Sequence, residues 1–229
     1  MLLRRFTEQA RVARLFVAAT TALVVLVLAG CASSGVSPDE PKRTESAAES
    51  SVGRSSNQFI PADVPERVRT MYEQAVAVMA SGDFVDAELR FEEFALQYPN
   101  YPGAHVNLAI IRASNGDDIR ARQAIDAALA VDPNHVPALN QLGMLLRRNG
   151  NFMEAEAAYL KAVTVQPDYA LAHYNLGVLN ELYLQRLDVA LQHFESYQAL
   201  VGDDKQVEKW IADLKRRVAA SRRTANVAE

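Results

Sequence analysis

The chain has 229 residues, about half of them apolar, and a formal net charge of -4. This size fits one medium-sized domain with accessory segments, and the acidic balance argues against a nucleic-acid-binding protein, which would carry a basic patch. With Cys31 as its single cysteine, the chain can form no intrachain disulfide, and no Cys/His cluster has the spacing of a structural zinc site.

Residues 1–30 have the pattern of a secretory signal peptide. Four arginines among the first 14 residues precede an uncharged apolar run at 15–29, and a basic region followed by an apolar region is typical of such peptides. The run is shorter than the ~20 residues that span a bilayer comfortably. The pattern therefore favours a cleaved peptide over a signal-anchor helix.

The end of this segment, Leu28-Ala29-Gly30-Cys31, resembles the lipobox of bacterial lipoproteins. The resemblance implies cleavage before Cys31 and acylation of that cysteine, and two or more acyl chains anchor a protein stably. Cys31 is then an anchor point and neither a nucleophile nor a metal ligand. The alternative is a stray cysteine beside a peptide that is cut elsewhere. Ala32 stands where the family's inner-membrane retention signal has aspartate, so we expect an outer-membrane lipoprotein facing the periplasm; inner-membrane anchoring is the alternative.

Residues 31–62 are rich in Ser, Ala, Pro and Glu and contain few large apolar side chains. Such a composition cannot bury enough surface to offset the entropy of ordering. We therefore predict a flexible, lipid-anchored linker, and about 30 residues of flexible coil have an r.m.s. span of roughly 30 Å.

A 34-residue period begins at Val68, which we number as position 1 of the repeat. Glycine recurs at position 15, alanine at position 20, a large apolar residue at position 24 and proline at position 32. Small residues let two helices of a hairpin approach closely, and proline ends the second helix. The recurring residues are Gly82, Gly116 and Gly150; Ala87, Ala121 and Ala155; Phe91, Ile125 and Tyr159; and Pro99, Pro133 and Pro167.

Together with Leu139, Leu142 and Gly143, and with Leu176 and Gly177, this pattern resembles the tetratricopeptide-repeat (TPR) family over about residues 68–200. The resemblance implies an all-α, right-handed superhelical solenoid of about four helix hairpins. The expected TPR domain covers 63–201, with units at 68–101, 102–135, 136–169 and 170–201.

Two units depart from the family pattern. Ala75 replaces the usual glycine of the first unit. In the fourth unit Ala190 comes one place late, which predicts one inserted residue in the turn near 184–187.

A repeat array needs caps at its ends, and residues 204–220 have the pattern of a C-terminal capping helix. Their apolar side chains form one stripe, so we interpret Trp210 as a core residue; an exposed partner anchor is the alternative. Residues 221–229 are predicted to be a disordered tail. The stripe consists of Val207, Trp210, Ile211, Leu214 and Val218.

TPR proteins use the concave groove lined by the first helix of each unit, so the resemblance places binding at positions 5, 6, 9 and 12. Asn107, Gln141 and Asn175 share position 6, and amides both donate and accept, so this row could hold an extended peptide backbone. The alternative is ordinary polar residues on a solvated helix face. The predicted partner-binding residues are Tyr72, Val106, Asn107, Ile110, Asn140, Gln141, Met144, Arg147, Tyr174, Asn175 and Val178.

Three further interpretations concern charged and titratable residues. Positions 5 and 6 carry no lysine or arginine, so recognition of an acidic C-terminal tail is not expected. Arg147 and Arg148 are interpreted as part of a solvated face. His105 and His173, both at position 4, are interpreted as structural residues between helices.

The chain offers no nucleophile with a base, no metal constellation and no phosphate loop. We therefore expect no catalysis, no cofactor and no metal. The leading hypothesis is a scaffold or adaptor that binds a protein or peptide of unknown identity during assembly of an envelope complex. The alternatives are an accessory subunit of an envelope transport or energy-transducing complex, and a structural lipoprotein associated with the cell wall.

Overall fold

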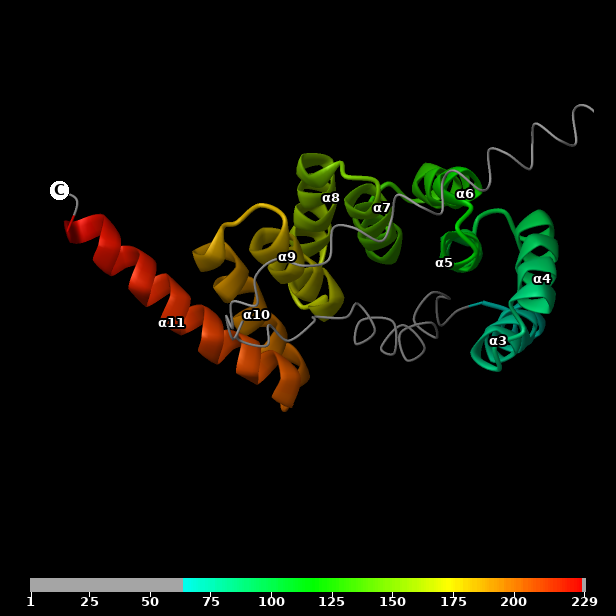
Figure 1. Cartoon of the computed structure of the whole chain (residues 1–229). Helices are drawn as coiled ribbons and strands as arrows, with labels where there is room; N and C mark the ends of the chain where they lie inside the picture. The colour runs from blue at the N-terminus through cyan, green and yellow to red at the C-terminus, as the bar shows by residue number, and fades with distance from the viewer. Residues whose placement is uncertain (1–63, 228–229) are drawn as a thin grey trace, which may run out of the picture. The chain divides into compact units, whose positions relative to one another are not determined.

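The computed structural model describes residues 64–227, and all regular secondary structure in that range is helical (Figure 1). The predicted signal peptide, Cys31 and the whole predicted linker lie outside the described residues. No helix in the described range is long and apolar enough to cross a membrane. The helices are α3 (Glu66–Ala80), α4 (Phe84–Gln97), α5 (Pro102–Ser114), α6 (Asp118–Val131), α7 (Val136–Arg148), α8 (Phe152–Val165), α9 (Ala170–Leu182), α10 (Leu187–Val201) and α11 (Lys205–Val227).

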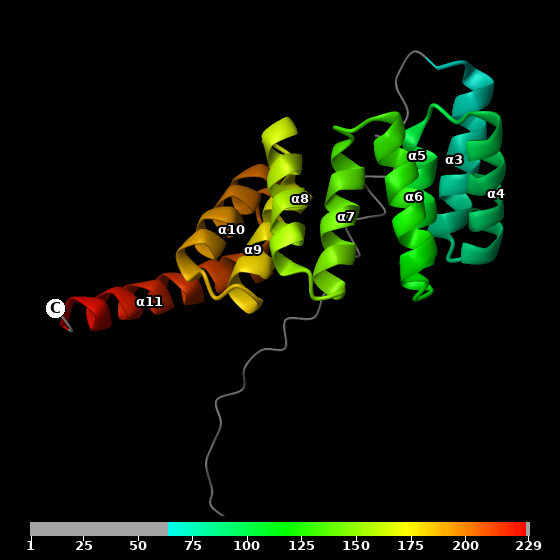
Figure 2. The ribbon, with the colours of Figure 1, turned by 90° about the horizontal axis from the view of Figure 1, so that it is seen from above.

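The first eight of these helices form four consecutive hairpins, α3–α4, α5–α6, α7–α8 and α9–α10. Within each hairpin the two helices pack together, and the second helix then packs on the first helix of the next hairpin (Figure 2). Each hairpin coincides with one predicted unit, which confirms the all-α solenoid.

The turns inside the first three hairpins share one backbone conformation. Gly82, Gly116 and Gly150 all have φ between +77° and +88°, a region that favours glycine because it has no Cβ. In the first two turns an aspartate follows the glycine and caps the next helix. The carboxylate of Asp83 accepts from the backbone N–H of Asp86, and that of Asp117 from the N–H of Arg120.

The turn of the fourth hairpin differs. Four residues separate α9 from α10, whereas three separate α7 from α8, so the inserted residue lies where the sequence predicted it. Gln185 occupies the place of the turn glycine and has a φ of 56°. Its Nε2 donates to the carbonyl oxygens of Glu181 and Leu182.

In each hairpin, position 8 on the first helix carries a small residue and position 24 on the second helix carries a large one. A Cβ added to Gly143 would lie 2.4 Å from Tyr159 Cε1, and one added to Gly177 would lie 2.8 Å from Phe194 Cδ1. Glycine therefore lets the aromatic ring rest directly on the backbone of the first helix. The first two units have the fully buried pairs Ala75 with Phe91 and Ala109 with Ile125 at these positions.

Helix α11 covers the end of the array. Val207, Trp210 and Leu214 are buried in one cluster with Tyr174 and Phe194, so Trp210 is a core residue, as predicted. If the fourth unit has 34 residues plus the inserted one, a fifth unit would begin at Lys205. Helix α11 therefore stands where the first helix of that unit would be.

The boundary predicted for α11 is wrong. The helix continues to Val227, so 221–227 are helical and not part of a disordered tail. In the register of a fifth unit, Ala219 stands where the other units have a turn residue, and alanine continues a helix readily. The last turns of α11 lead away from α10 (Figure 1).

Candidate interaction surface

Positions 5, 6, 9 and 12 of α3, α5, α7 and α9 form one surface, which we call the first-helix face. The structure places most of its predicted binding residues in the core. Only Ile110, Gln141 and Met144 are half-buried. The predicted residues that are buried are Tyr72, Val106, Asn107, Asn140, Arg147, Tyr174, Asn175 and Val178.

The buried asparagines connect neighbouring units. Asn107 Nδ2 donates to the hydroxyl of Tyr72 at 2.8 Å, and Asn175 Nδ2 donates to Asn140 Oδ1 at 2.9 Å. Both bonds join position 5 of one unit to position 6 of the next. Burial raises the pKa of the Tyr72 phenol, while the bond from Asn107 lowers it less, so this hydroxyl stays protonated.

These bonds contradict the prediction that Asn107, Gln141 and Asn175 form a row of amides available to a peptide. Asn107 and Asn175 are each 1 % exposed, so their amides are used inside the array. Gln141 keeps a half-buried position, but position 5 of the preceding unit, the corresponding partner position, is Val106, which offers no polar side chain. The hydrogen-bonding partner of Asn175 is Asn140, one place earlier in the register than Gln141.

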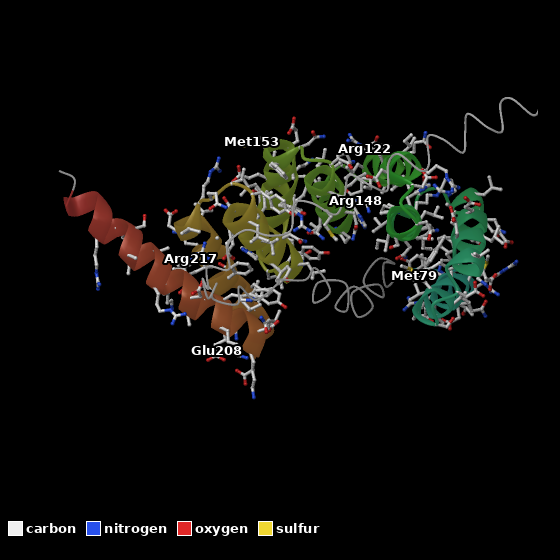
Figure 3. All side chains as sticks on the ribbon, in the orientation of Figure 1. Met79, Arg122, Arg148, Met153, Glu208 and Arg217 are labelled. Carbon is white, nitrogen blue, oxygen red and sulfur yellow. The ribbon has the colours of Figure 1, made fainter. Side chains whose placement is uncertain are left out.

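A second link between units recurs at positions 12 and 13. Arg148 Nη1 donates to the carbonyl oxygen of Ala113 at 2.8 Å, and Arg217 Nη1 donates to Glu181 Oε1 at 2.7 Å. Figure 3 labels the two arginines. Arg217 on α11 therefore repeats the role of Arg148 on α7.

The environment of Arg147 differs from the one predicted. The side chain is buried, and its guanidinium lies 5.9 Å from the centroid of the Tyr183 ring. The interpretation of Arg147 as part of a solvated face is therefore wrong. Arg148 is exposed but bonded to Ala113 and to the carboxylate of Asp118.

The fourth unit contributes little accessible surface to the first-helix face. Tyr174, Val178 and Glu181 are all buried, and the Trp210 ring of α11 lies 6.1 Å from that of Tyr174. Side chains of α11 cover these positions, because Trp210 packs in one cluster with Tyr174 and Val178, and Arg217 donates to Glu181. The accessible part of the first-helix face is therefore confined to the first three units.

In those three units position 9 carries an apolar residue each time, and we call Val76, Ile110 and Met144 the position-9 row. All three are half-buried and pack on the core from one side. Met79 and Ala113 at position 12 have the same intermediate exposure. The 34-residue register places all three on the predicted groove, although the predicted partner-binding residues included only Ile110 and Met144.

Comparisons with known proteins agree with this architecture. Models of the tetratricopeptide repeat match residues 78–143 and 140–205. A structure from the functional characterisation of pilF of Pseudomonas aeruginosa is similar, with a TM-score of 0.61, 22 % identity, and coverage of 68 % of this chain and 70 % of the other.

Two further structures are similar. For MamA of Desulfovibrio magneticus RS-1 the TM-score is 0.55, with 20 % identity and coverage of 71 % and 91 %. For a thermophilic TPR protein of Thermus thermophilus it is 0.57, with 20 % identity and coverage of 66 % and 82 %. No curated protein sequence matches the chain.

At such identities the solved structures support the fold alone. The two repeat matches together cover more than half of the chain. Repeats of this kind generally serve protein interaction without catalysis, which identifies the general role of the molecule as an interaction scaffold. The chain belongs to the tetratricopeptide-repeat family.

Proposed function

We propose that the chain is a lipid-anchored scaffold of the bacterial envelope that binds a partner protein along the first-helix face of its first three units. The position-9 row carries this proposal, because three consecutive units present a half-buried apolar side chain at one register position. The buried residues at positions 5 and 6 serve packing and hydrogen bonding between units. The position-9 row keeps apolar surface accessible, and such surface is typical of interaction sites.

The chemistry of this surface indicates the kind of partner. Val76, Ile110 and Met144 offer apolar contacts at regular intervals, with Met79 and Ala113 beside them. An amphipathic helix or an extended segment with spaced apolar side chains would fit such a row. The amide of Gln141, also half-buried, could donate to or accept from the partner's backbone. Methionine adapts to differently shaped partners.

The envelope location rests on the sequence of residues 1–62. The signal-peptide pattern and the lipobox resemblance support acylation of Cys31, and Ala32 supports the outer membrane. The linker would let the repeats reach a partner in the periplasm. An accessory subunit of a transport or energy-transducing complex, or a cell-wall-associated lipoprotein, would differ in the partners recovered.

The test is cross-linking in intact cells followed by recovery of the tagged protein and identification of its partners. The variant Ile110→Glu/Met144→Glu places charges on the first-helix face. The matched control Ile119→Glu/Met153→Glu makes the same two changes on the second helices, where these side chains are 75 % and 56 % exposed. We expect the wild type and the control to recover the same partners and the first variant to lose them.

Circular dichroism would establish that both double variants keep their helical content. Loss of partners in the control with retention in the Ile110/Met144 variant would place binding on the second helices and contradict the proposal. For the anchor, Cys31→Ala should move the protein out of the outer-membrane fraction. Unchanged fractionation of this variant would contradict lipid anchoring.

A further inference from the structure

Two histidines meet between the helices of the fourth hairpin. His173 on α9 and His193 on α10 are both half-buried, and their Nδ1 atoms lie 3.2 Å apart. The ring centroids are 5.4 Å apart, with an interplanar angle of 44°. The two imidazoles therefore approach each other through one nitrogen each and do not stack.

A backbone carbonyl determines which ring nitrogen of His173 carries a proton. Its Nε2 lies 3.0 Å from the carbonyl oxygen of Pro167, which can only accept a hydrogen bond, so Nε2 carries the proton. A neutral His173 then has its lone pair on Nδ1, directed at His193. We assign this tautomer from the hydrogen-bond partners.

His193 is neutral near pH 7. Burial lowers its pKa to about 4, the nearby His173 adds to this effect, and Glu156 opposes it. In the metal-free pair His193 donates from Nδ1 to Nδ1 of His173. If its proton moves to Nε2 by exchange with solvent, each of the two Nδ1 atoms carries a lone pair, and the two atoms lie 3.2 Å apart.

We propose that His173 and His193 chelate one divalent transition-metal ion through their two Nδ1 atoms. Bonds of about 2.0–2.1 Å from each nitrogen to the metal, with the nitrogens 3.2 Å apart, give an N–metal–N angle of about 100°. This lies between the octahedral and the tetrahedral angle. The Pro167 carbonyl would orient His173, as backbone carbonyls orient metal-bound histidines elsewhere.

The ligand set indicates the class of metal. Imidazole suits Zn²⁺, Ni²⁺ and Cu²⁺ and not Mg²⁺ or Ca²⁺, which prefer oxygen ligands. Between residues 64 and 227 no group of three or more His, Cys, Asp or Glu residues is arranged to hold a metal ion. The site therefore has two protein ligands, with water in the remaining positions. The metal would join α9 to α10 across the hairpin whose turn has the extra residue.

The test is calorimetric titration with Zn²⁺ at neutral pH, using the full chain without a histidine tag and with Cys31→Ala to remove the thiol. His173→Gln and His193→Gln are compared with the control His105→Gln/His135→Gln, which removes the other two histidines. We expect one Zn²⁺ per chain in the parent and the control, and at least about tenfold weaker binding in both single variants. Zn²⁺ should raise the Tm only where it binds.

Equal binding in the parent and in the His173 and His193 variants would overturn the proposal, as would a parent that binds no Zn²⁺. A spectroscopic measurement covers the case in which a variant does not fold. In the electron paramagnetic resonance spectrum of the parent with one equivalent of Cu²⁺, we expect coupling to two imidazole nitrogens. Coupling to fewer than two would also overturn it.

Discussion

The first three units and the fourth unit follow the same sequence pattern but end in different surroundings. In the first three, a glycine forms the turn and another complete hairpin follows. In the fourth, Gln185 occupies the turn and the single helix α11 follows. Position 9 is half-buried in the first three units, whereas Val178 is buried in the fourth. The comparison teaches that the exposure of a repeat position depends on the element that follows it as much as on its own helix.

The largest expected effect contrasts Trp210 with Gln141, which share position 6 of the repeat register. Trp210 is 4 % exposed and packs with Tyr174 and Phe194, so Trp210→Ala should lower the free energy of unfolding by about 3–5 kcal/mol. Gln141→Ala removes a half-buried polar side chain and should change it by about 0.5 kcal/mol or less. Urea denaturation followed by circular dichroism measures both. Similar values for the two variants would show that α11 does not stabilise the fourth unit.

A smaller effect distinguishes the units with glycine at position 8 from those with alanine. Gly177→Ala would bring a Cβ to 2.8 Å from the Phe194 ring, and such overpacking costs about 1–3 kcal/mol of unfolding free energy. The reverse change in the second unit, Ala109→Gly, should cost about 0.5–1 kcal/mol, because glycine loses more backbone entropy. The same denaturation experiment separates the two. An increase in stability for Gly177→Ala would mean that α9 and α10 can separate freely.

The turns offer a pair of reciprocal changes. Gln185 has a positive φ without being glycine, and this conformation costs an L-residue roughly 1–2 kcal/mol. Gln185→Gly should therefore raise the free energy of unfolding by about 1 kcal/mol or less, since the bonds from Nε2 are lost. Gly150→Ala should lower it by about 1 kcal/mol. Thermal unfolding of both variants is the measurement, and a destabilising Gln185→Gly would assign more weight to those bonds than to the backbone.

A further effect concerns acid pH. The pKa of His193 is about 4 in the fold and near 6.5 when unfolded, so below pH 6.5 the unfolded chain binds the proton first. Stability should therefore fall as the pH decreases from about 6.5 to about 4. Burial also lowers the pKa values of His105 and His135, so His193→Gln should flatten the dependence only in part. Melting temperatures across this range, with and without the substitution, provide the check. If the melting temperature changes with pH equally in the wild type and in His193→Gln, His193 does not contribute to the dependence.

The sequence predicted those features that depend on neighbours along the chain. The turn glycines, the small and large residues at positions 8 and 24, and the one-residue insertion before Ala190 all leave a local pattern. The register also identified Trp210 as core, because its apolar stripe has the period of a helix. These elements account for the helices and their pairing.

Features that depend on contacts between units were not predicted. The bond between Asn140 and Asn175 joins position 5 of one unit to position 6 of the next. Comparing residues at the same position in successive units cannot reveal such a bond. The burial of Arg147 similarly depends on Tyr183 in the irregular turn. Residues 221–227 were assigned to a tail, although no residue in that segment interrupts a helix.

Helix α11 also limits where the array can gain repeats. His173 and Gly177, at positions 4 and 8 of the fourth unit, contact α10. In α11 these positions are occupied by Glu208, labelled in Figure 3, and Ala212, and both residues are exposed. A second helix added after α11 would find neither a turn at Ala219 nor an apolar partner. Lengthening this protein by duplication would therefore have to insert new hairpins before α11, so the array can grow internally while its C-terminal end stays the same.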